Sequence, residues 1–164
     1  MAAALVLTLQ GCGRAANATD AASAAPRIAA ATDIEAGRYL VKIGGCNDCH
    51  TPGFSETNGA TPEADWLTGA PVGAAGPWGV SYPVNLRLAL STMDEDEFLD
   101  LAHAGEGRPP MPWPSLKAMS DGDLRAIYRY IRWLGPKGVP APAPLAPGEK
   151  PAGPTITFVP SMPS

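Results

Sequence analysis

The sequence predicts an all-α domain with three main helices and long loops. Three observations carry this prediction. Each expected helix begins at a capping residue or an acidic turn, each ends at glycine, and alternating apolar strands are missing. The chain has 164 residues, of which 45% are hydrophobic, so it suffices for one modest core with tails.

The first helix is expected directly after Thr32. The Thr32 hydroxyl can accept a hydrogen bond from the third amide of the helix, and Glu35 can reach back toward the start, which makes a capping box. Gly44-Gly45 ends this helix, and its inward stripe is Ile34, Gly37, Leu40 and Val41. Glycine inside a helix is about 1 kcal/mol less favourable than alanine. Gly37 therefore indicates a place where another helix approaches closely.

The second and third helices lie later in the chain. The second is expected from Ser91 or Thr92 to Gly105, with acidic residues in its first turns. The prolines between 109 and 114 are expected to exclude a helix from the segment that follows. The third helix begins at the Ser120 cap and ends at Gly135-Pro136, with an apolar stripe of Leu124, Ile127, Tyr128, Ile131 and Leu134.

Four segments follow from these boundaries: a leader (1–18), a flexible tether (19–32), the helical domain (33–136) and a proline-rich tail (137–164). Nine of residues 136–164 are proline, so the tail is expected to be extended rather than packed. No run of 18 or more apolar residues occurs, so no membrane-spanning helix is expected.

The leader "MAAALVLTLQGC" resembles the end of a bacterial lipoprotein signal peptide. This resemblance implies lipid attachment at Cys12 and anchoring to a bacterial membrane on the periplasmic side. It departs from the usual pattern in Gln10 and in lacking a positively charged start. A cut after Ala16-Asn17-Ala18 would instead release a soluble exported protein.

Composition excludes several classes of function. The formal net charge is −4, from 12 basic and 16 acidic residues, and no basic block occurs, so nucleic acid is not an expected partner. The sequence also lacks a Ser/His/Asp set, a phosphate-binding loop and an HExxH motif. Hydrolase and transferase activities are not expected.

The distinctive motif is Cys46-Asn47-Asp48-Cys49-His50. A structural zinc site needs about four ligands; only His103 could complete it, and the adjacent Cys49 and His50 do not easily point at one ion. A thioredoxin-like pair would need βαβ segments around it, and a secreted disulfide scaffold would need more cysteines. The remaining meaning of C-x-x-C-H is covalent attachment of haem c.

Haem attachment explains the spacing of the motif. Cys46 and Cys49 would form thioether bonds to the two vinyl groups of one haem, and His50 would ligate the iron. The loops between residues 51 and 90 are long for a compact domain. A large flat apolar cofactor would supply the surface against which they pack.

The second axial position decides the function. Its candidates are Met93, Met111, Met119, Met162 and His103. Met111 is favoured because it lies in the proline-stiffened stretch "RPPMPWP", whereas a lone methionine elsewhere is usually core filler. Methionine ligation gives a raised potential suited to electron transfer.

The order helix, CxxCH, long loop, helix, proline-flanked methionine, helix resembles class I cytochrome c. The stretches "MPWPSLKAMSDGDLRAIYRYIRWLGP" and "GPWGVSYPVNL" are similar to cytochrome subunits of periplasmic dehydrogenases. The resemblance covers about residues 33 to 136. Those subunits often carry several haem domains, whereas this chain has one CxxCH.

The resemblance implies a cytochrome c fold around one covalent haem, in a periplasmic electron carrier that is not itself an enzyme. Its partners would be a dehydrogenase as donor and an oxidase or another cytochrome as acceptor. The first and last helices would cross, with Gly37 and Leu40 or Val41 meeting Tyr128 and Ile131. The haem propionates could be reached by donors on Trp78, Tyr82, Asn85 and Arg108, although each of these is equally well explained without haem contact.

Two alternatives stay open at this point. One is a haem enzyme or sensor, peroxidase-like or gas-binding, with a displaceable sixth ligand. The other is a purely structural lipoprotein in which CxxCH is coincidental.

Overall fold

The computed structural model describes residue 28 and residues 30–159. The predictions for the leader, for Cys12, for most of the tether and for Met162 concern residues outside this range. The described elements are α2 (Asp33–Ile43), α3 (Cys46–His50), a 3-10 turn (Glu63–Asp65), β1 (Gly73–Gly76), β2 (Gly79–Ser81), α4 (Leu86–Ala89), α5 (Glu95–Ala104), α6 (Trp113–Lys117), α7 (Asp121–Leu134) and β3 (Thr155–Thr157).

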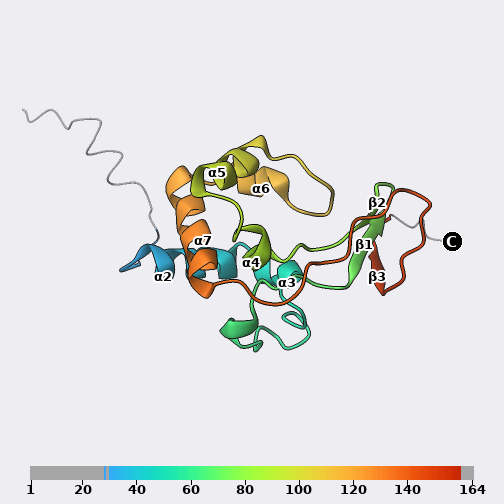
Figure 1. The fold of residues 1–164 in the computed structure, drawn as a ribbon, viewed down its shortest axis with the longest axis horizontal. Coiled ribbons are helices and arrows are strands. Elements are labelled where there is room, and N and C mark those ends of the chain that lie inside the picture. Colours follow the sequence, from blue (N-terminus) through green and yellow to red (C-terminus); the bar gives the residue numbers. More distant parts are fainter. Residues whose placement is uncertain (1–27, 29, 160–164) are drawn as a thin grey trace, which may run out of the picture.

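Helices α2 and α7 cross at the centre of the helical part (Figure 1). A Cβ atom on Gly37 would lie 2.0 Å from the Ala126 carbonyl oxygen and 2.6 Å from Tyr130 Cβ. The predicted close approach at Gly37 is therefore confirmed. The expected partners of Gly37, Tyr128 and Ile131, are wrong, since it is Ala126 and Tyr130 that lie against it.

The helix caps follow from local sequence. Thr32 Oγ1 accepts from the Glu35 amide at 3.2 Å, while the Glu35 carboxylate accepts from the Ala31 amide at 3.1 Å. Ser120 caps α7 and Gly135 ends it, as predicted. The predicted start of the second helix at Ser91 or Thr92 is wrong. The N-cap is Asp94, the first residue of the acidic run, which forms a capping box with Glu97.

A short helix occupies part of the segment from which helix was excluded. Pro114 lies within the first two positions of α6, where its missing N–H is not needed for an intrahelical bond. The prolines thus set where this helix begins. The exclusion holds at Pro109, Pro110 and Pro112 and is wrong at Pro114.

The prediction of a strictly all-α fold is wrong, because a three-stranded sheet with order β2-β1-β3 lies at one end of the molecule (Figure 1). Strand β1 pairs antiparallel with β2 and parallel with β3. Since β3 comes from the proline-rich tail, the expectation that the tail does not pack is wrong for these residues. The threonines and isoleucine of "TIT" have high strand propensity, whereas the prolines lie outside the strand.

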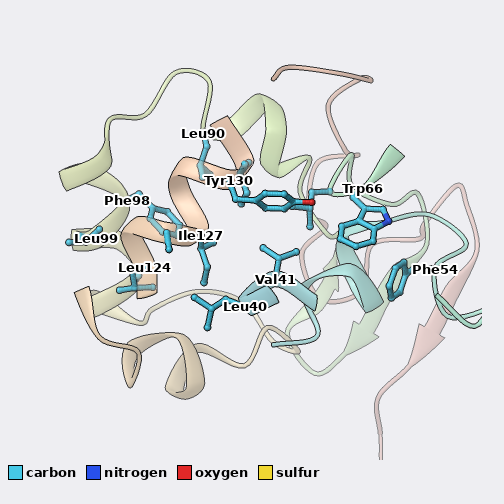
Figure 2. Packing of buried hydrophobic residues seen from close by; sticks show 14 residues of the cluster. Leu40, Val41, Phe54, Trp66, Leu90, Phe98, Leu99, Leu124, Ile127 and Tyr130 are labelled. Atoms are coloured by element: carbon cyan, nitrogen blue, oxygen red, sulfur yellow. The ribbon is translucent and has the colours of Figure 1, made fainter. Parts of the chain in front are cut away.

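The hydrophobic core lies where α2, α5 and α7 meet and continues to the loop after α3 (Figure 2). Val41, Leu124 and Tyr130 are fully buried. At the loop end, Phe54 and Trp66 pack edge to face with ring centroids 5.7 Å apart. No helix in the described part of the chain is long and apolar enough to cross a membrane.

Charged side chains join α5 and α7 at the surface. Glu95 accepts from Arg125 at 2.7 Å and from Arg129 at 3.0 Å, and Arg129 also pairs with Asp33 of α2. The hydrogen bond from Arg129, and then that from Arg125, lowers the pKa of Glu95. Glu95 and Asp96 of α5 and Arg125 and Arg129 of α7 therefore neutralise one another.

We expect Gly37→Ala to lower the free energy of unfolding by about 3 kcal/mol, the upper range for overpacking. The added methyl group would collide with the backbone of α7, which cannot move without opening the helix crossing. Urea unfolding measures the change. Gly122→Ala is the matched control in α7, where the nearest atom is Ser120 Oγ at 3.8 Å. It should be neutral or stabilise by up to about 1 kcal/mol.

The Glu95 cluster predicts an acid-sensitive contribution to stability. Because the folded-state pKa of Glu95 lies below its ordinary value of 4.5, this contribution is present above pH 4.5 and is lost as pH falls through the folded-state value. We expect Glu95→Gln to reduce the fall in unfolding free energy between pH 6 and pH 3. Glu56→Gln removes an exposed carboxylate that makes no ion pair in the described residues. If Glu56→Gln reduces the fall in unfolding free energy as much as Glu95→Gln does, the acid-sensitive contribution does not come from Glu95.

Candidate functional site

The Cys46–His50 motif forms the short helix α3, directly after α2. Gly45 has a φ of +70°, which lets the chain leave α2 and start a new helix within two residues. Thr51 ends α3 in extended conformation. The two cysteines and the histidine thus lie on one helical turn, with Cys46 half-buried, Cys49 exposed and His50 buried.

Both thiols are unpaired. Burial raises the pKa of Cys46 to about 11 and also raises the pKa of Cys49. Redox-active CxxC pairs instead hold one thiol at a lowered pKa, because the thiolate is the reactive form. The environment of this pair does not match that chemistry.

The His50 ring is fixed by one hydrogen bond. Its Nδ1 lies 2.8 Å from the carbonyl oxygen of Val84, and the side chain is only 8% exposed. Burial lowers the pKa of His50, while the bond to Val84 acts in the opposite direction. The ring is therefore neutral at pH 7, with Nδ1–H donating, which leaves the Nε2 lone pair available to a metal.

A polar network holds α3 against the following loop. The Thr51 hydroxyl donates to Asn47 Oδ1 at 2.7 Å and accepts from the Leu67 amide at 2.8 Å. The Gly69 amide donates to the His50 carbonyl at 2.8 Å. Asn47 is fully buried within this network. The backbone of the CxxCH turn is therefore tied to residues 67–69.

Met111 lies half-buried in the loop between α5 and α6. The Trp113 amide donates to the Met111 carbonyl at 2.8 Å, and Trp113 Nε1 donates to the Arg108 carbonyl at 3.4 Å. These bonds close residues 108–113 into one compact turn, which we call the Met111 loop. Its backbone is constrained on both sides of the methionine.

Residues 79–84 connect the two candidate ligands. Val84 accepts the bond from His50, and the Ser81 hydroxyl donates to the Pro109 carbonyl at 2.6 Å. The turn that carries His50 and the loop that carries Met111 are therefore both fastened to one extended segment of six residues. The sequence analysis did not assign a role to Ser81 or Val84.

The other candidates for the second axial position have other neighbours, although Met119 lies close to the motif: a Cβ on Gly44 would be 3.7 Å from Met119 Cε and 3.9 Å from Cys46 Sγ. Met93 and Met119 are partly buried against the core, and the Met93 carbonyl accepts from Tyr128 Oη at 2.8 Å. His103 Nε2 pairs with Asp121 Oδ1 at 2.8 Å on the surface. The side chains of the two methionines pack against the core, and the His103 ring is paired with Asp121.

Three of the four proposed propionate donors bond to the protein backbone. Trp78 Nε1 donates to Ala74, and Arg108 Nη1 donates to Leu145 at 2.8 Å. Asn85 is buried; its Nδ2 donates to the carbonyls of Lys137 and Val139, and its Oδ1 caps α4 at the Leu88 amide. Both the Nδ2 and the Oδ1 atoms of Asn85 are thus hydrogen-bonded to the protein backbone. Tyr82 is half-buried.

These residues fit a covalently attached haem. Two protonated thiols stand three positions apart on one turn, beside a neutral imidazole whose orientation is set by a backbone carbonyl. No group of three His, Cys, Asp or Glu side chains that could hold a metal ion occurs within residues 28 and 30–159. In this part of the chain, the motif is not completed to a zinc-type cluster.

Comparison with known proteins gives one informative similarity. Over 108 residues the chain is 29% identical to the gluconate 2-dehydrogenase cytochrome c subunit of Pantoea cypripedii, which covers 60% of this chain. The chain spans 22% of the length of that subunit. No protein-family profile and no solved structure matches the chain. The similarity supports a cytochrome c-like relationship.

The bonds of Asn85 predict a structural role rather than contact with a cofactor. We expect Asn85→Ala to lower the free energy of unfolding by about 2 kcal/mol, from a lost cap and two carbonyls left without donors. Asn85→Asp keeps the cap oxygen but turns a carboxylate oxygen toward the same two carbonyl oxygens in a buried place, so it should lose more than Asn85→Ala. Urea unfolding measures both, and the reduction potential should stay at the wild-type value. A shifted reduction potential in Asn85→Ala would contradict the structural role. The potential of Asn85→Asp does not test it, because this variant adds a charge.

Proposed function

We propose that this chain is a c-type cytochrome that carries one electron at a time. Cys46 and Cys49 would hold one haem c as thioethers, and His50 and Met111 would be the axial ligands of its iron. The observation that carries this proposal is the buried His50, which follows the CxxC pair on one turn and whose Nδ1 is engaged by Val84 at 2.8 Å. The similarity to a cytochrome c subunit supports it.

When bound, the haem supplies the ferric–ferrous couple, and the protein supplies ligands, orientation and burial. His50 would bind through Nε2, because Nδ1 carries the proton donated to Val84. The bond to Val84 fixes the plane of the ring, while burial keeps the imidazole neutral. Little has to move when the charge on the iron changes, since α3 is tied to residues 67–69.

Met111 would complete the coordination with a thioether sulfur, which needs no deprotonation. The prolines before and after it restrict the backbone, so little entropy is lost when the side chain is held in one place. A filled sixth position leaves no site for peroxide or gas. Electron transfer is therefore favoured over the haem enzyme or sensor.

The partners and location follow from the same proposal. The relative is a subunit of a dehydrogenase. We therefore infer a dehydrogenase as electron donor and an oxidase or another cytochrome as acceptor. Covalent attachment suits an oxidising space, which is consistent with a periplasmic protein held to a bacterial membrane through Cys12.

Visible spectra of the protein expressed with haem-attachment machinery test the ligation. We expect the oxidised wild type to be low-spin, to show the far-red sulfur-to-iron band and to ignore carbon monoxide when reduced. Met111→Ala should lose the band and bind carbon monoxide. Met119→Ala, which removes a methionine packed against the core, should keep the band.

A different result would identify the rival. If the wild type is high-spin or binds carbon monoxide readily, the sixth position is open and the enzyme or sensor replaces the carrier. If no haem stays bound after denaturation, the thioether assignment of Cys46 and Cys49 is wrong.

A further inference from the structure

The tail runs from the end of α7 back to the sheet (Figure 1), and we call residues 137–159 the strap. It is attached at three points. Its start accepts two hydrogen bonds from Asn85, at 2.8 and 3.1 Å. Its middle pairs with β2, where Val80 and Leu145 exchange backbone bonds of 3.1 and 2.9 Å. Its end forms β3 beside β1.

The middle attachment coincides with the Met111 loop. The Leu145 carbonyl accepts from the Val80 amide and also from Arg108 Nη1, at 2.8 Å. The next residue of the loop, Pro109, accepts from the Ser81 hydroxyl at 2.6 Å. Strap, β2 and Met111 loop therefore meet at one junction.

We propose that the strap is a positioning element for Met111, and that Arg108 and Ser81 are the positioning residues that transmit its hold. This inference rests on the proposed function, in which Met111 ligates the iron. Arg108 and Pro109 are exposed, so burial does not hold this part of the loop. Its prolines stiffen the loop internally, and the bonds of Arg108 and Ser81 fasten it to the strap and to β2.

The junction predicts how easily Met111 leaves the iron. Opening the loop breaks the bonds from Arg108 and Ser81, each of which stabilises the closed form by an amount that corresponds to about a tenfold change in an equilibrium. In the intact protein, hydroxide would compete with the methionine sulfur for the iron as pH rises, so the pH at which the far-red band is lost reports this opening. A weakened junction should move the loss to lower pH.

Gly79→Ala in the full-length, haem-loaded protein places a methyl group where the strap meets β2. The added Cβ would lie 2.2 Å from the Leu145 oxygen, and Gly79 has a φ of +95°. Gly148→Ala is the matched control: it lies in the strap with a φ of +89°, and nothing stands within 4 Å. It therefore carries the backbone strain without the collision.

We expect the band of Gly79→Ala to disappear at a pH lower by about one unit, a tenfold shift in opening. Gly148→Ala should match the wild type. Arg108→Leu and Ser81→Ala should shift the band in the same direction, and Ser81→Thr, which keeps the hydroxyl, should restore it. Urea unfolding measured beside the spectra separates loop opening from global destabilisation.

Two results would overturn the inference. If Gly79→Ala and Arg108→Leu keep the wild-type band at every pH, the strap does not position Met111, although the ligation stands. If the wild type carries haem but shows no sulfur-to-iron band, Met111 ligation itself fails, and the role of the strap fails with it.

Discussion

The hydrogen bond from His50 Nδ1 to the Val84 carbonyl is the constraint on which the site depends. It selects the tautomer of the ring, leaves the lone pair on Nε2 and ties α3 to residues 79–84. The same segment holds Pro109 through Ser81. One short extended stretch therefore sets the relative placement of the two candidate ligands, which come from turns 61 residues apart in the chain.

This arrangement explains why so much of the chain has little regular structure. Between α3 and β1 the backbone is held by single anchors, such as Thr51 to Leu67, rather than by strand pairing. A loop held by single hydrogen bonds also needs side chains or a cofactor packed against it to keep one conformation. Phe54 and Trp66 provide part of that packing, and a bound haem would provide more. The sheet and the strap stabilise the same loops from outside.

The sequence predicted features that depend on neighbouring residues. The Thr32 and Ser120 caps, the glycine stop after α2 and the close approach at Gly37 all follow from local chemistry and are confirmed. The partners of Gly37 could not be read in the same way, because the rotation of one helix against another depends on the whole core. Strand β3 was not predicted, because three residues are too few to show the apolar–polar alternation that indicates a strand. Val84 acts through its backbone carbonyl, so its side chain gives no signal.

An NMR spectrum of the reduced, haem-loaded protein observes both candidate ligands at once, since ferrous low-spin iron is diamagnetic. We expect a slowly exchanging Nδ1 proton of His50 with cross-peaks to Val84. We also expect one methionine methyl resonance, shifted far upfield by the haem ring and assigned to Met111. A rapidly exchanging His50 proton, or an upfield methyl that belongs to Met93 or Met119, would contradict the account.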